Sequence, residues 1–101
     1  MNNNTYHVFF RNLSNNLRIN IIAELKKGDL SVTELVEKLK VEQSKISHAL
    51  SLLKRCNIVK SKIEGKKRIY SLNKRTILPI LKLIDKHEQT FCGGNCKFCK
   101  K

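Results

Sequence analysis

The chain has few acidic residues and no long apolar segment. Of its 101 residues only 8 are Asp or Glu, Trp is absent, and no run approaches 18 apolar residues. A membrane-spanning helix needs about 20 such residues, and an interfacial helix relies on Trp or Phe along one side, so we expect no membrane association. The N-terminus, Met1-Asn2-Asn3-Asn4, lacks the basic and apolar regions of a signal peptide. We therefore expect a cytoplasmic protein.

Positive charge dominates the composition. The formal net charge is +13 and the isoelectric point is near 9.9, which on so short a chain favours an anionic partner. With membranes set aside, nucleic acid is the expected partner. The hydrophobic fraction of 41% suits one folded domain with a modest core. In a cytoplasmic protein the cysteines are expected to be thiols or metal ligands rather than disulfides.

The first third of the chain predicts two helices after a loose tail over residues 2–4. Four apolar side chains share one face of the first helix: Tyr6, Phe9, Phe10 and Leu13. An aromatic face of this kind suits core packing and a subunit interface equally. Ser14 is the expected N-cap of the second helix, and Gly28 its left-handed C-cap.

Residues 31–72 predict a helix–turn–helix followed by a hairpin. Ser31 and Glu34 have the spacing of a capping box, which starts a helix. The expected elements are this helix through Leu39, a second helix over 42–56, and strands over 58–63 and 68–72 joined at Gly65. The predicted fold class is mainly α with a β-hairpin wing, a winged helix-turn-helix of about five helices.

The last predicted helix, over 74–89, has more apolar residues than one stripe can hold. They are Ile77, Leu78, Ile80, Leu81, Leu83 and Ile84. Pro79 is compatible with this helix only if it begins near Thr76. A small winged domain offers one face for packing, so the surplus predicts a homodimer through the first and last helices. Full burial within one chain is the alternative.

The candidate DNA-binding residues lie on the helix over 42–56 and on the hairpin. Those expected at base edges in the major groove are Gln43, Ser44, Lys45, Ser47 and His48. Those expected on phosphates are Lys54, Arg55, Lys60, Lys62, Lys66, Lys67 and Arg68. The alternative is a basic protein-interaction module, because the same fold serves both purposes. The charge excess argues against it.

Several segments resemble the ArsR/SmtB family of winged-helix repressors. Residues 9–18 (FFRNLSNNLR) resemble the family's F-x-x-L-S-x-x-x-R opening, and residues 43–50 (QSKISHAL) resemble its recognition helix. Residues 53–59 and 64–72 resemble its helix end and wing, so the resemblance covers about residues 6–89. It implies a homodimer that binds an inverted-repeat operator on double-stranded DNA. In many members a metal or an oxidant releases the DNA.

Neither common metal site of the family carries over to this chain. The family's thiolate pair in the helix before the recognition helix is absent from residues 34–39 (ELVEKL). Of the carboxylate and imidazole pairs on the family's last helix, only His87 survives. Ala49 stands where many members have a histidine. The effector therefore cannot be taken from the resemblance.

The C-terminal tail supplies a ligand set of its own. The spacing His87-x4-Cys92-x3-Cys96-x2-Cys99 combines one imidazole with three thiols, a donor set that suits tetrahedral zinc. Neighbouring lysines favour the thiolate form, which promotes metal binding and oxidation alike. Redox-active thiols and idle thiols therefore remain alternatives. Cys56, among apolar neighbours, is expected to be a buried structural thiol.

Together these features predict two regions: a winged helix-turn-helix domain over 1–89 and a cysteine-rich tail over 90–101. The predicted function is a homodimeric transcriptional regulator, a repressor, that responds to metal or to thiol state through the tail. A thiol redox sensor on the same scaffold and a zinc-stabilised interaction module without DNA readout are the alternatives. No nucleophile–base constellation argues for catalysis.

Overall fold

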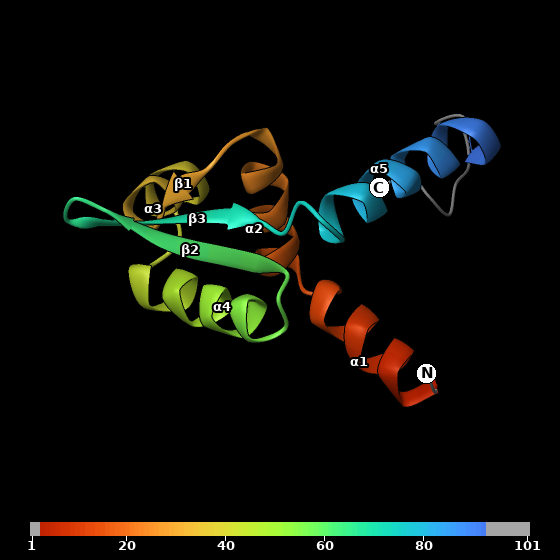
Figure 1. The fold of residues 1–101 in the computed structure, drawn as a ribbon, viewed down its shortest axis with the longest axis horizontal. Helices are drawn as coiled ribbons and strands as arrows, with labels where there is room; N and C mark the ends of the chain where they lie inside the picture. The colour runs from red at the N-terminus through yellow and green to blue at the C-terminus, as the bar shows by residue number, and fades with distance from the viewer. Residues whose placement is uncertain (1–2, 93–101) are drawn as a thin grey trace.

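The computed structural model describes residues 3–92 (Figure 1). Its elements are α1 (Asn3–Leu13), α2 (Asn16–Lys27), β1 (Leu30–Ser31), α3 (Val32–Leu39), α4 (Gln43–Arg55), β2 (Val59–Glu64), β3 (Lys67–Leu72), α5 (Ile77–His87) and the π-helical turn η1 (Glu88–Cys92). The β2–β3 hairpin extends to one end of the domain, and α1 and α5 project from the other (Figure 1). The predicted winged helix-turn-helix is confirmed.

A short strand that the sequence analysis missed makes the wing three-stranded. The sheet order is β1-β3-β2, and both pairings are antiparallel. Leu30 lies opposite Tyr70 in the first pair, and Val59 lies opposite Leu72 in the second. β1 has two residues, too few to display the alternation by which a strand is read from sequence.

The core lies between α2, α3, α4 and one face of the sheet. Its most deeply buried side chains are Ile21, Leu35, Ile46, Leu50, Leu53, Ile58 and Val59. On α4 the apolar residues recur at helical spacing. They therefore share one face, which is buried, and the polar residues occupy the other face. Within the described chain, α1 has no buried residue and α5 has only Ile77. These two helices therefore stand at the margin of the core.

Several predictions about the first two helices are wrong in detail. Residues 3–4 belong to α1 rather than to a loose tail. Asn15, not Ser14, caps α2, because its side-chain oxygen accepts a hydrogen bond from the backbone N–H of Arg18 at 3.1 Å. Gly28 has an extended backbone with φ of 168°, because the chain runs on directly toward β1 instead of turning back over the helix.

The last helix begins where Pro79 requires it to begin. Thr76 is the N-cap, so Pro79 falls in the first turn, where its missing N–H costs no helical hydrogen bond. The predicted end was wrong, because η1 continues the winding past Thr90 to Cys92. An ion pair between Lys26 and Asp85 joins α2 to α5. Among the described helices, none has the length and apolar character that crossing a membrane requires.

Candidate nucleic-acid interface

The solvent-facing side of α4 carries the polar residues that the sequence analysis singled out. Ile46, Ala49, Leu50 and Leu53 face the core. All the α4 candidates are exposed: Gln43, Ser44, Lys45, Ser47, His48, Lys54 and Arg55. The helix therefore presents a continuous hydrogen-bonding and basic surface, of a width that the major groove of B-DNA accepts.

The start of α3 and the turn into α4 fix the orientation of α4. The Ser31 hydroxyl accepts from the backbone N–H of Glu34 at 3.2 Å, and the Glu34 carboxylate accepts from the backbone N–H of Ser31 at 2.9 Å. The predicted capping box is thus confirmed. Two hydrogen bonds lower the pKa of Glu34 below its ordinary value. The larger effect comes from the bond donated by the Ser31 backbone, and the smaller one from the bond with the Ser31 side chain. Lys40 adopts a left-handed backbone, φ 58°, between α3 and α4.

The wing places a second group of cations beside α4. Gly65 has φ of 63° at the hairpin turn, a conformation that glycine adopts without strain. The exposed cations of the wing are Lys60, Lys62, Lys66, Lys67 and Arg68. Lys62 pairs with Glu64 at 3.1 Å, and the Arg68 guanidinium donates to the Ser61 hydroxyl at 3.5 Å. In the described chain, Lys60 and Lys66 have neither an ion pair nor a side-chain hydrogen bond, so their charge is available to phosphate.

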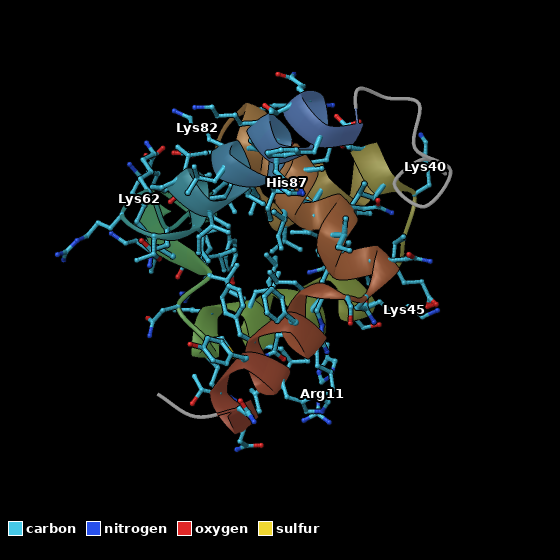
Figure 2. All side chains as sticks on the ribbon, turned by 90° about the vertical axis from the view of Figure 1, so that its right-hand side faces the viewer. Arg11, Lys40, Lys45, Lys62, Lys82 and His87 are labelled. Carbon is cyan, nitrogen blue, oxygen red and sulfur yellow. The ribbon has the colours of Figure 1, made fainter. Side chains whose placement is uncertain are left out.

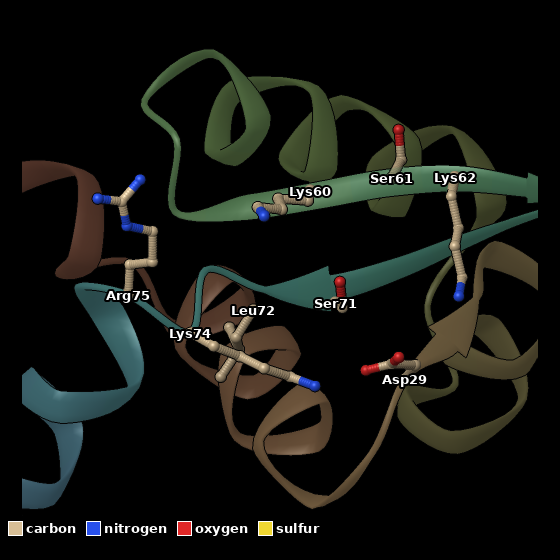
Figure 3. Close-up of a pocket in the computed structure, with 8 residues that line it drawn as sticks. All are labelled: Asp29, Lys60, Ser61, Lys62, Ser71, Leu72, Lys74 and Arg75. Carbon is tan, nitrogen blue, oxygen red and sulfur yellow. The ribbon is translucent and has the colours of Figure 1, made fainter.

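The base of the wing holds a basic hollow that the sequence analysis did not predict. It has a volume of about 310 Å³ and is lined by Asp29, Lys60, Ser61, Lys62, Ser71, Leu72, Lys74 and Arg75 (Figure 3). Because three separate segments of the chain contribute to this hollow, no local sequence motif predicts it. The one signal in the sequence is the pair of adjacent cations Lys74 and Arg75, which follow β3 after Asn73.

Cys56, at the end of α4, is exposed and not the buried thiol that was expected. Its apolar neighbours in sequence turn into the core, whereas its own side chain faces α1. The Asn12 side-chain amide donates to Cys56 Sγ at 3.0 Å. Asn12 also accepts from the Arg18 guanidinium, through its backbone carbonyl at 3.3 Å. Asn12 thus joins α1 to α2 and to the end of α4.

An apolar groove separates α1 from α5 at the end of the domain that faces the viewer in Figure 2. Its volume is about 620 Å³, and it is lined by Thr5, Tyr6, Phe9, Phe10, Ile80, Leu83, Ile84 and His87. Of the apolar residues of α5, Ile80, Leu83 and Ile84 line this groove, and Leu83 and Ile84 are 65% and 53% exposed. The alternative in which all of them are buried within one chain is therefore wrong.

The expected metal ligands are only partly within the described structure. Cys96 and Cys99 lie outside residues 3–92, and for Cys92 only the backbone is described. His87 is exposed at the end of α5, and its ring packs against Phe91 with centroids 4.9 Å apart. Over residues 3–92 no group of three or more His, Cys, Asp or Glu side chains is placed to hold a metal ion.

Comparison with known proteins agrees with this architecture. The sequence profile of the bacterial regulatory protein arsR family matches residues 15–61. The HTH-type transcriptional regulator NmtR of Mycobacterium tuberculosis is 38% identical over 55 residues, which span 54% of this chain and 46% of NmtR. The transcriptional repressor SdpR of Bacillus subtilis is 31% identical over 64 residues, 63% of this chain and 71% of SdpR.

A solved structure extends the similarity to nearly the whole fold. The crystal structure of Rv0081 from M. tuberculosis superposes with a TM-score of 0.80 at 28% identity, covering 89% of this chain and 91% of that one. Because the matched residues include the helix–turn–helix and the start of the wing, the likeness lies in the region that carries the candidate interface. The chain belongs to the arsR family of bacterial regulatory proteins, whose members are transcriptional regulators and not enzymes.

Proposed function

We propose that this chain is a homodimeric, sequence-specific DNA-binding repressor. The observation that carries the proposal is the exposed polar face of α4, which lies beside a wing rich in lysine. A polar helix reads base edges and an adjacent cationic hairpin holds phosphate, so the two together suit duplex DNA better than an acidic protein surface.

The residues divide into two roles. The first half of α4 enters the major groove, where Lys45 donates to the guanine acceptors and Gln43 pairs with adenine. Ser44, Ser47 and His48 lie near base edges. Lys54, Arg55 and the wing cations meet phosphate, which fixes the register of the protein on the duplex without reading sequence.

A second copy of the chain is the partner that covers the groove between α1 and α5. Phe10 and Leu83 on its two walls are 61% and 65% exposed. Large apolar side chains gathered in this way mark an interaction surface on a small protein. Twofold pairing through this surface turns two α4 helices toward one duplex, and the matching operator is an inverted repeat.

Selection from a random duplex library tests the DNA assignment. The wild-type protein is expected to enrich an inverted repeat with half-sites about one helical turn apart. The Lys45→Ala/His48→Ala variant keeps the buried face of α4, and it is expected to fold but to enrich no such sequence. If folded wild-type protein enriches nothing, the interaction module without DNA readout replaces this proposal.

We propose that zinc regulates DNA binding, held by Cys92, Cys96 and Cys99 together with His87. The donor set suits tetrahedral zinc. His87 is exposed at the end of α5, and η1 leads from it directly to Cys92. Zinc would supply a structural crosslink there. Because His87 also lines the groove between α1 and α5, loading the site would alter the surface that pairs the two copies.

Metal analysis of anaerobically purified protein tests this input. The proposal expects about one zinc per chain, lost when Cys92, Cys96 or Cys99 is changed to Ser, and a DNA affinity that depends on zinc. A metal-free protein whose DNA affinity changes reversibly with oxidant is instead the redox sensor. DNA affinity that responds to neither would contradict both forms of regulation.

A further inference from the structure

The hollow at the base of the wing differs from the rest of the basic surface in two ways. It is concave, and its lining residues come from three separate segments of the chain. Lys60 lies directly opposite Ser71 across the β2–β3 pair, on the sheet face away from the core residue Val59. Lys74 and Arg75 come from the turn into α5, and Asp29 from the residue before β1. In Figure 3, Lys62 and Lys74 both extend toward Asp29, while Arg75 stands at the opposite rim.

The charge in this hollow is largely uncompensated. Within the described chain, the charged groups of Lys60, Lys74 and Arg75 make no ion pair and no hydrogen bond, and Lys62 pairs with Glu64. Asp29 is the one carboxylate in the lining. The Ser71 hydroxyl is available as a donor among these cations. Clustered cations with a hydroxyl at the centre match a phosphate group.

The lining also excludes most organic ligands. Among the described residues that line it, Leu72 is the only apolar one, and it is buried beneath the surface. The described lining contains no aromatic ring or apolar wall that could recognise a base, sugar or acyl group. The hollow can therefore recognise a phosphate but little that is attached to it, which is the chemistry of contacts to a nucleic-acid backbone.

We propose that this hollow binds a backbone phosphate of the DNA that flanks the sequence read by α4. The inference rests on the proposed DNA-binding function. In Figure 2, Lys62, which lines the hollow, and Lys45 on α4 lie on opposite sides of the view. A phosphate held in the hollow is therefore a different one from those nearest Lys45. Lys60 and Lys62 connect the hollow to the wing tip, giving DNA a continuous cationic path from the tip to the start of α5.

Two duplexes distinguish flanking contacts from core contacts. The first is the sequence selected from a random library, trimmed to the shortest length that binds; the second adds about ten base pairs, one helical turn, on each side. Wild-type protein is expected to bind the extended duplex more tightly, with a log–log salt slope steeper by about 0.9 for each added phosphate. Each such phosphate corresponds to about a threefold change in affinity between 50 and 200 mM salt.

Two variants, each of which removes two positive charges, test whether the gain in affinity from flanking DNA depends on the hollow. Lys74→Gln/Arg75→Gln removes two exposed cations of the hollow, and Lys82→Gln/Lys86→Gln removes two exposed cations of α5 outside it. The first variant is expected to lose the gain from flanking DNA while binding the trimmed duplex within about twofold of wild type. The second variant keeps the gain. Circular dichroism confirms that both are folded.

Three results would overturn this inference alone: no gain from flanking DNA in the wild type, retention of the gain in Lys74→Gln/Arg75→Gln, or equal weakening on both duplexes. A site for a small phosphorylated molecule would instead appear as release of the trimmed duplex by millimolar pyrophosphate, abolished in Lys74→Gln/Arg75→Gln. Wild-type protein that binds neither duplex would overturn the DNA-binding function itself.

Discussion

The side-chain amide of Asn12 in α1 donates a hydrogen bond to the thiol sulfur of Cys56, 3.0 Å away at the end of α4. The two residues are 44 positions apart in sequence, and they join a helix of the groove to the helix with the candidate DNA-reading face. An exposed bond of this kind contributes little to stability, on the order of 1 kcal/mol or less. Its importance lies in linking the positions of the two helices.

Exposure of Cys56 predicts that its thiol reacts in the native protein. Treating folded, reduced protein with iodoacetamide and mapping the peptides is expected to show Cys56 alkylated without denaturant, because its side chain reaches solvent. Asn12→Ala is expected to raise the labelling rate, since it removes a side chain that contacts the sulfur and restricts access to it. Labelling of Cys56 only after unfolding would restore the earlier expectation of a buried thiol.

The groove between α1 and α5 predicts the oligomeric state. Phe10→Glu/Leu83→Glu is expected to convert a dimer into a folded monomer, because both side chains are largely exposed in the single chain and contribute little to its core. Light scattering after size exclusion gives the mass. Ile63→Glu, which changes a similarly exposed residue on the wing, is the control and leaves the mass unchanged. Dimers in both variants would place the interface elsewhere.

The capping box predicts a pH-dependent contribution from Glu34. Hydrogen bonds from Ser31 lower the pKa of this carboxyl in the folded state, so its stabilisation is present above the ordinary pKa of glutamate and is lost as pH falls through the lowered value. In Glu34→Gln the amide oxygen still accepts, but the charge is gone. Urea unfolding is therefore expected to find wild type more stable at pH 7, with the difference shrinking as pH falls through the lowered pKa of Glu34. A difference independent of pH would contradict the assignment.

Base-edge and phosphate contacts predict different signatures on DNA. Lys45→Ala is expected to cost about 1–3 kcal/mol on the selected sequence and to relax the preference at one base position. Lys66→Gln/Lys67→Gln is expected to weaken binding to all sequences alike and to reduce the salt slope by about 0.9 for each phosphate lost. Fluorescence anisotropy on matched and mismatched duplexes separates the two. Identical behaviour of the two variants would contradict the assigned roles.

Local signals allowed most of the fold to be predicted from sequence. The capping box at Ser31 and Glu34 and the glycine turn at Gly65 were located correctly, because each is decided by residues close in the chain. β1 was missed because its pairing with Tyr70 depends on a distant segment. The exposure of Cys56 depends on where α1 lies, and the hollow on three segments brought together. Such features follow from tertiary packing, which no local pattern encodes.

The salt dependence of DNA binding tests the central claim most directly. If a dimer on its selected duplex neutralises about six phosphates, the logarithm of the association constant falls with the logarithm of salt concentration with a slope near −5. An anisotropy titration from 50 to 300 mM KCl, in the presence of unlabelled nonspecific duplex, gives this slope. The account predicts a value near −5 with preference for the selected sequence. A slope near zero, or no preference, would contradict it.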